Sequence, residues 1–382
     1  MMWMALTPRQ LDLFVQPVVD VYTTLENELF TLIVRRLKTK KNISADNVLA
    51  WQIEKLNQVH ALDQQMINKI SKASGVSAKK LFSIVKDAGY SDLKQVDNYF
   101  SKLAEAGAVL PLVGDGQTIV DKVMRSYFKL AQSNYKRINQ TMLSQARQIY
   151  SDIIHETTQS VLAGLKTHRQ ALAETVSKFA ENGVPALVDK ANKRWTPESY
   201  VKTVTRTTVN SVYNSIEDER MSEFGVDLVR ISQHIGARPT CSLVQGKVIC
   251  LLSVEETKTK YGNKYMSIYS PELRYGYGDG IFGCNCRHHR FAFIEGINIA
   301  PDESELIDEE ENKRVYMLSQ QQRLMERDIR AAKRKLSAAE ELGDELAVKK
   351  AKQAVRTKQS KLRAFVKTHN LTRQYNREKV YA

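Results

Sequence analysis

The chain has 382 residues, of which 42% are hydrophobic and 26% charged, as is ordinary for a globular protein of two or three domains. No uncharged apolar run approaches the roughly 18 residues of a membrane span, and the start "MMWMALTPRQ" lacks a signal-peptide pattern, so we expect no membrane contact and synthesis in the cytoplasm. Four cysteines are too few for a disulfide scaffold in a chain of this length, and the net charge of +14 favours an anionic partner.

The N-terminal half, residues 1–195, is predicted to be helical. Thr7 followed by Pro8 forms a suitable N-cap and first-turn pair. Helix-breaking residues predict breaks or kinks between helices at three places: Pro17, residues 111–116 and residues 182–185.

An apolar stripe at helical spacing is predicted from Leu49, Ile53 and Leu56, with His60 on the same stripe. A lone histidine in such a position is more often a packed core residue than a ligand. We therefore expect His60 to be buried.

Residues 67–90, "INKISKASGVSAKKLFSIVKDAGY", have the rhythm of a helix-turn-helix. One helix is expected to end at Gly75, and Ser77 is expected to cap a second helix that carries Lys79 and Lys80. Such an element either reads DNA or is simply a packed helix pair.

The composition changes at Trp195. Thr196-Pro197-Glu198 predicts the start of a helix that extends to about Phe224. Its expected buried side consists of Val201, Val204, Val212 and Ile216.

Glycine-rich turns dominate the next segment, because nine of the chain's 17 glycines lie between Gly225 and Gly296. The stretches "VDLVRISQH", "GKVICL" and "RFAFIEG" are predicted strands. We therefore expect a mainly α protein with an extended helical region at residues 1–195, a small α+β domain at 196–300, an acidic linker at 301–311 and a basic helical tail at 312–382.

The tail is predicted to form a helical hairpin. Ile329 and Leu336 are seven residues apart, and Gly343-Asp344 suits the end of one helix and the cap of the next. A single long helix that tolerates Gly343 is the alternative.

Residues 313–382 contain 19 Lys or Arg and seven Asp or Glu, a net charge of +12. A helical face with this charge density attracts polyanions, above all double-stranded DNA. The alternatives are a solvated surface or an acidic protein partner. The expected nucleic-acid contacts are Lys333, Arg334, Lys335, Lys349, Lys350, Lys352, Arg356 and Lys358.

The stretch "GCNCRHHRF" at residues 283–291 predicts a structural clamp, held either by zinc or by packing and hydrogen bonds. Zinc prefers four sulfur or nitrogen donors, and the candidates are His234, Cys241, Cys284, Cys286 and His288. The first choices are His234, Cys241, Cys286 and His288, and Cys284 is able to replace one of these four. Otherwise the thiols pack the turn and Arg287 and the histidines bond its backbone.

A family resemblance rests on "HIGARPTCSLVQGKV" followed by "GYGDGIFGCNCRHHRFAFIEG". These segments resemble the core of phage minor capsid proteins with a MuF-like head-morphogenesis domain, and "VKTVTRTTVNSVYNS" resembles its opening helix. The residues that fit the motif are Arg206, Thr207, Asn210, Arg238, Gln245, Gly246 and Arg287. Cys241 stands where a histidine is common in that pattern.

The resemblance implies a minor component of the phage particle, located inside the head near the portal and assembled in the host cytoplasm. Such proteins associate with the portal protein, assist head assembly alongside scaffold and major capsid proteins, and contact DNA during packaging or ejection. No catalytic residues are expected.

Two other functions stay open. A metal-dependent nuclease would use Asn285, His288 and His289 beside a metal ion. A helix-turn-helix DNA-binding protein would use residues 67–90.

Overall fold

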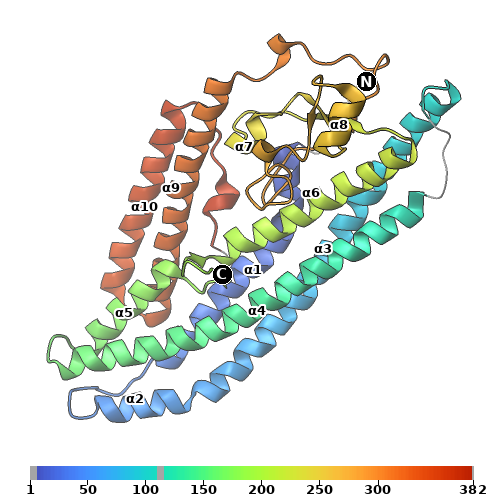
Figure 1. Cartoon of the computed structure of the whole chain (residues 1–382). Helices are drawn as coiled ribbons and strands as arrows, with labels where there is room; N and C mark the ends of the chain where they lie inside the picture. Colours follow the sequence, from blue (N-terminus) through green and yellow to red (C-terminus); the bar gives the residue numbers. More distant parts are fainter. Residues whose placement is uncertain (1–6, 110–115, 381–382) are drawn as a thin grey trace. The chain divides into compact units, whose positions relative to one another are not determined.

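The computed structural model describes residues 7–109 and 116–380, and its secondary structure is mainly α-helical, as the sequence predicts (Figure 1). Its α-helices are α1 (Pro8–Leu37), α2 (Val48–Asn57), α3 (Val59–Glu105), α4 (Gly116–Leu162), α5 (His168–Asn182), α6 (Pro197–Glu223), α7 (Pro239–Ser242), α8 (Val254–Tyr261), α9 (Glu309–Leu342) and α10 (Glu345–Thr368).

The chain divides into two compact units, each assembled from three segments. Unit 1 comprises Met1–Pro17, Lys79–Asn134 and Lys202–Ser319. Unit 2 comprises Val18–Ala78, Tyr135–Val201 and Gln320–Ala382. These units differ from the four consecutive segments expected from the sequence, because the boundaries fall inside α1, α3, α4, α6 and α9.

Helix α1 begins where Thr7 and Pro8 predict. The Thr7 hydroxyl accepts a hydrogen bond from Gln10 N at 3.2 Å, and the Gln10 side chain accepts one from Thr7 N at 2.8 Å, which forms a capping box. Pro17 lies inside α1 and does not end it. Helix α5 ends at Asn182 as predicted, whereas residues 111–115 lie outside the described part of the chain.

The predicted helix-turn-helix at residues 67–90 is wrong. Helix α3 runs without interruption from Val59 to Glu105 and passes through Gly75. Gly75 has a right-handed backbone there, so it weakens the helix by about 1 kcal/mol relative to alanine without breaking it. Ser77, expected as a cap, is a buried residue within the helix. No recognition helix separated by a turn exists in this segment.

The buried face of α2 also differs from the predicted stripe. Leu49 and Ile53 are 53% and 61% exposed, and His60 is exposed in α3. The buried residues of α2 are Val48, Trp51 and Lys55. The stripe was wrong because α2 packs inward by its Val48, Trp51 and Lys55 side, and because α2 ends at Asn57, which places His60 in another helix.

Unit 1 contains a four-stranded sheet with the order β5-β4-β3-β6. Its strands are β3 (Leu228–Ile231), β4 (Val248–Cys250), β5 (Met266–Ser267) and β6 (Arg290–Ala292). β3 pairs antiparallel with β4 and β6, and β4 pairs parallel with β5. The predicted strands match β3, β4 and β6, so a small α+β region within a mainly α fold is confirmed. In unit 2, β1 (Leu187–Val188) and β2 (Arg194–Trp195) form a separate antiparallel pair.

The core of unit 1 joins the end of α3, the end of α6 and the sheet. Phe100 of α3 stacks on Phe224 with ring centroids 4.3 Å apart. Val229 of β3 and Ile249 of β4 belong to the same buried cluster. Helix α6 spans the predicted range, and its predicted buried residues are buried: Val201, Val204, Val212 and Ile216.

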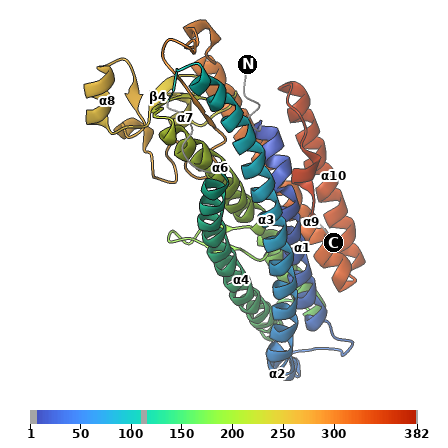
Figure 2. The ribbon, with the colours of Figure 1, turned by 90° about the vertical axis from the view of Figure 1, so that its right-hand side faces the viewer.

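In unit 2, α9 and α10 form the predicted hairpin and lie side by side in both views (Figures 1 and 2). Gly343 has φ +76°, and the Asp344 side chain accepts a hydrogen bond from Ala347 N at 3.1 Å. The turn residues therefore end one helix and cap the next, as glycine and aspartate do at these positions. The alternative of one long helix is wrong.

The segment after α10 packs against α9 within unit 2. The segment η3 (Tyr375–Glu378) ends in the buried Glu378. The two carboxylate oxygens of Glu378 accept hydrogen bonds from Nε and Nη2 of Arg373. Arg330 of α9 donates to the Arg377 carbonyl and pairs with Glu198 at 2.9 Å. Several basic residues of the tail therefore have partners inside their own unit.

Among residues 7–109 and 116–380, no helix combines the length and apolar character that crossing a membrane requires.

Two glycines test the helix assignments. Gly75→Ala should raise the free energy of unfolding by about 0.5–1 kcal/mol, because alanine is the better helix former and open space surrounds the position. Gly343→Ala should lower it, because an alanine at φ +76° is strained although nothing crowds it. Urea unfolding of the two variants measures both effects, and destabilisation by Gly75→Ala would contradict the continuous helix.

Candidate functional site

In unit 1, one face of α6 binds residues 283–291, which we call the Cys/His segment. Arg206 donates to the Asn285 side-chain oxygen at 2.9 Å, and Asn285 N donates to the Thr207 hydroxyl at 3.2 Å. The side-chain amide of Asn285 also donates, through Nδ2, to the Thr203 hydroxyl at 3.0 Å. Thr203, Arg206 and Thr207 are three and four residues apart, so they face the same side of the helix.

The same helix face continues to the backbone beyond Asn285. Asn210 and Asn214 each donate to the His288 carbonyl, at 3.3 and 3.2 Å. The Asn214 side-chain oxygen accepts from Arg290 N at 3.1 Å. The Asn214 side chain thus bonds the carbonyl before His289 and the amide after it, as the backbone of a neighbouring strand would.

Two arginines of this region share one carboxylate. Asp12 pairs with Arg206, and its other oxygen lies 3.1 Å from Arg287 Nη2. Asp12 and Arg206 are buried, so each neutralises a charge that would be costly alone. Arg287 therefore points to an acidic residue.

Arg238 clamps the glycine-rich loop that precedes the Cys/His segment. Its guanidinium donates to the Cys284 carbonyl at 3.0 Å and to the Gly280 carbonyl. A Cβ on Gly280 would lie 1.7 Å from the Arg274 carbonyl oxygen, and one on Gly283 would lie 2.3 Å from a neighbouring carbonyl oxygen. Only glycine permits the loop to fold this tightly.

Three predicted metal ligands come together. Cys241 of α7 and Cys286 place their Sγ atoms 3.9 Å apart, and Cys286 Sγ lies 3.5 Å from His288 Nδ1. The three donor atoms all lie within 4.8 Å of one another, and all three residues are buried.

The hydrogen bond between the two thiols shifts their pKa values in opposite directions. Donation from Cys241 lowers the pKa of Cys286 well below its ordinary value, and the same bond raises the pKa of Cys241. Arg238 Nε lies 3.4 Å from Cys241 Sγ and supplies a positive charge beside the sulfur pair.

His234 borders the group. Its ring stacks on the His288 ring with centroids 4.5 Å apart. Burial, followed by the neighbouring His288, lowers the pKa of His234 to about 4, so its imidazole is neutral near pH 7. Its Nδ1 lies 3.3 Å from the Ile235 carbonyl, and its buried Nε2 makes no hydrogen bond within the part of the chain described.

Gln245 supports the histidines, and the neighbouring Gly246 allows the close approach of Leu306. The Gln245 side-chain oxygen lies 3.5 Å from His288 Nε2 and accepts from His234 N at 3.2 Å. Gly246 has φ +79°, and a Cβ there would lie 2.6 Å from a methyl of Leu306. Both positions therefore have a local structural requirement.

The other two cysteines lie outside the group. Cys284 is exposed, and Cys250 is buried in β4 within a small apolar cluster with Leu228 and Phe293. The structure thus brings together Cys241, Cys286 and His288, with His234 beside them, and separates Cys284 from the predicted set.

The predicted nucleic-acid contacts fall into two groups in unit 2. Arg334 is buried and donates to the carbonyls of Ala180 and Glu181, while Lys335 pairs with Glu181. Lys333 donates to the Glu378 carbonyl at 2.7 Å. These three side chains are occupied within the unit.

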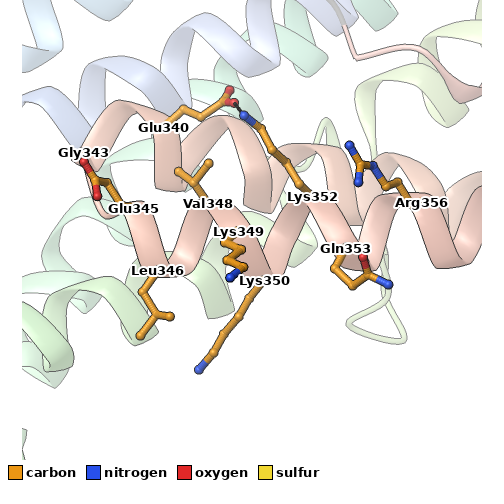
Figure 3. A pocket seen from close by; sticks show the side chains of 10 residues that line it. All are labelled: Glu340, Gly343, Glu345, Leu346, Val348, Lys349, Lys350, Lys352, Gln353 and Arg356. Atoms are coloured by element: carbon orange, nitrogen blue, oxygen red, sulfur yellow. Dashed lines mark ion pairs between the residues drawn. The ribbon is translucent and has the colours of Figure 1, made fainter.

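The remaining predicted contacts lie on α10. Lys349, Lys350, Lys352 and Arg356 are exposed. Figure 3 shows Lys352 reaching back to Glu340 of α9, at 3.5 Å, beside a pocket over the hairpin turn. Lys358 is partly buried and pairs with Asp328 at 3.3 Å.

A basic stripe runs along α10, and we define it by its residues: Lys349, Lys352, Arg356, Arg363 and Lys367. All five are exposed, and their spacings of three, four, seven and four residues keep them on one helix face. Arg363 and Lys367 were not among the predicted contacts, although their helical spacing from Arg356 could have revealed them.

Three residues of the Cys/His region were missed by sequence reasoning. Asn214 follows Asn210 by one helical turn, and this spacing was a usable signal. Asp12 is 194 residues from its partner Arg206 in the sequence, and Thr203 is 82 residues from its partner Asn285. No local pattern connects such distant positions.

Comparison with known proteins gives a consistent result. Residues 6–367 match a family described as phage minor capsid protein 2. A structural protein of Lactococcus phage LL-H is 30% identical over 378 residues, which cover 95% of this chain and 98% of that protein. A structural protein of Lactococcus phage mv4 is 38% identical over 124 residues, 32% of this chain and 96% of that protein. No solved structure matches.

Asn214→Ala should lower the free energy of unfolding by roughly 2–3 kcal/mol, because it leaves the buried Arg290 amide without its acceptor and removes a donor to His288. Asn210→Ala is the matched control one turn away. It should cost only about 1 kcal/mol, because the His288 carbonyl keeps its bond from Asn214. Equal losses in chemical denaturation would contradict the bridging role of Asn214.

Proposed function

Because the chain belongs to the phage minor capsid protein 2 family and is a structural component of phage particles, we propose that it lies inside the head near the portal. There it assists head assembly and DNA packaging or ejection. Its proposed partners are the portal protein, the scaffold and major capsid proteins, and double-stranded DNA. Support for the portal part comes from the resemblance of residues 234–248 and 276–296 to the MuF-like domain.

The observation that carries the DNA part of the proposal is the basic stripe of α10. Helix α10 contains eight Lys or Arg and one acidic residue, Glu345, which is a net charge of +7. The stripe covers 18 residue steps from Lys349 to Lys367, or about 27 Å of helix at about 1.5 Å per residue. Duplex DNA carries about one phosphate charge per 1.7 Å of its axis, so several contacts can form at once.

Such contacts are independent of sequence. Lysine and arginine side chains bound to phosphates position a protein on DNA but carry no sequence information, because sequence is read from the base edges in the grooves. A component that handles the whole packaged genome requires binding of this kind.

The geometry favours a structural role over nuclease activity. The Cys241, Cys286 and His288 group is buried and offers two thiols, as closed structural metal sites do. A catalytic metal site keeps a position open to water. We therefore propose that the protein is not an enzyme. The helix-turn-helix alternative lacks its turn, because α3 is continuous.

Purified phage particles should contain the protein at a small fraction of the major capsid protein, as expected for a component confined to the portal region. Quantitative mass spectrometry of procapsids and mature particles measures this ratio. Absence from both kinds of particle, or a copy number equal to that of the major capsid protein, would contradict the proposed location.

Neutralising the basic stripe should weaken DNA binding. In the triple variant Lys349→Gln, Arg356→Gln, Arg363→Gln, the slope of log affinity against log salt should decrease in magnitude by about three, because each lost phosphate contact contributes about one. Fluorescence anisotropy with duplexes of unrelated sequence measures the slope.

The matched control is Lys72→Gln, Lys79→Gln, Lys80→Gln, which removes the same charge from exposed positions of α3. It should leave the slope near that of the unchanged protein. If the α3 variant loses as much binding as the α10 variant, net charge rather than the stripe governs DNA contact. Point variants are preferable to removal of residues 313–382, which would also remove the buried Arg330 and Arg334.

A further inference from the structure

We propose that Cys241, Cys286, His288 and His234 bind one structural zinc ion. This inference is independent of the role in the phage head and rests on the donor atoms of unit 1.

The spacing of the donor atoms fits tetrahedral zinc. Zn–S bonds of about 2.3 Å and Zn–N bonds of about 2.0–2.1 Å place two sulfurs about 3.8 Å apart, and a sulfur and a nitrogen about 3.5–3.6 Å apart. The Cys241 and Cys286 sulfurs are 3.9 Å apart, and Cys286 Sγ lies 3.5 Å from His288 Nδ1. These are the separations of two edges of the tetrahedron.

Each histidine has a ring nitrogen available for a metal; that of His288 lies within the three-donor group, whereas His234 lies outside it. A metal-bound imidazole uses one ring nitrogen for the metal and directs the other toward an oxygen acceptor. His288 directs Nε2 toward the Gln245 side-chain oxygen at 3.5 Å and Nδ1 toward Cys286. His234 directs Nδ1 toward the Ile235 carbonyl at 3.3 Å, which leaves Nε2 for the metal.

The unpartnered nitrogen of His234 identifies the fourth ligand. A buried polar atom without a hydrogen bond has lost its contact with water and gained none in return, so the Nε2 of His234 requires a partner. Its ring stacks on that of His288, which is itself a ligand. His234 lies beside the three-donor group, and binding would bring its Nε2 toward the other donors.

The chain positions explain what the ion would hold together. His234 follows β3, Cys241 belongs to α7, and Cys286 and His288 lie between the glycine-rich loop and β6. Only a small apolar cluster joins these segments here: Ala237, Cys241 and Cys286, with Phe282 packed against it. A zinc ion would cross-link the segments in addition to this packing, as structural zinc does in small domains.

Metal analysis of the whole protein tests the proposal. Protein produced with added zinc and purified under reducing conditions should contain about one zinc per chain by elemental mass spectrometry. Replacement by cobalt(II) should give thiolate-to-cobalt charge transfer and intense visible bands typical of tetrahedral coordination. Protein without bound zinc and without these bands, or with a Cys241–Cys286 disulfide in place of the metal, would overturn the proposal.

Substitutions separate the ligands from the other cysteines. Cys241→Ser and Cys286→Ser should each lose most of the zinc, whereas Cys250→Ser and Cys284→Ser should retain it. Loss of zinc in the Cys284 variant equal to that in the Cys286 variant would overturn this ligand set.

Two further variants test the histidine arrangement. His234→Gln should weaken zinc binding and alter the cobalt spectrum, and an unchanged spectrum would remove His234 from the ligand set. Gln245→Ala should weaken zinc binding roughly ten- to hundred-fold through the orientation of His288, since partners of ligand histidines have effects of this size. The cobalt titration of the unchanged protein decides the proposal even if a variant fails to fold.

Discussion

The carboxylate of Asp12 is the contact on which the geometry of the Cys/His region depends. It pairs with the buried Arg206 and with Arg287, which flanks Cys286 directly. A buried guanidinium without its counter-ion is strongly destabilising, by about 3–5 kcal/mol when one partner of such a pair is removed. The start of α1, the face of α6 and the Cys/His segment are therefore linked by one charge.

Polar contacts add to apolar packing in the rest of this region. The loop before Cys286 places Leu273 and Ile281 in the core of unit 1, while its carbonyls are held by Arg238 and the following backbone by Asn214. Buried backbone groups nearly always require such partners. The sheet and the ends of α3 and α6 supply the hydrophobic core of unit 1 nearby, around Phe100 and Phe224.

The sequence was most informative where local chemistry decides the structure. Gly343-Asp344 ends and caps helices by its own backbone and side chain, and the start of α6 at Pro197 follows the same logic. It misled where a glycine is merely tolerated, as at Gly75 in the continuous α3. At the candidate site the residue types indicated Cys241, Cys286 and the histidines, but the partnership of Asp12 with Arg206 joins positions 194 residues apart and leaves no local pattern.

The exposure of the cysteines has a practical consequence. Three of the four thiols are buried, and Cys284 alone of the four is exposed. A maleimide dye should therefore attach to the natural chain at a single surface position, with no engineered substitution. Fluorescence from that label offers a way to follow the protein in single phage particles while the genome leaves the head.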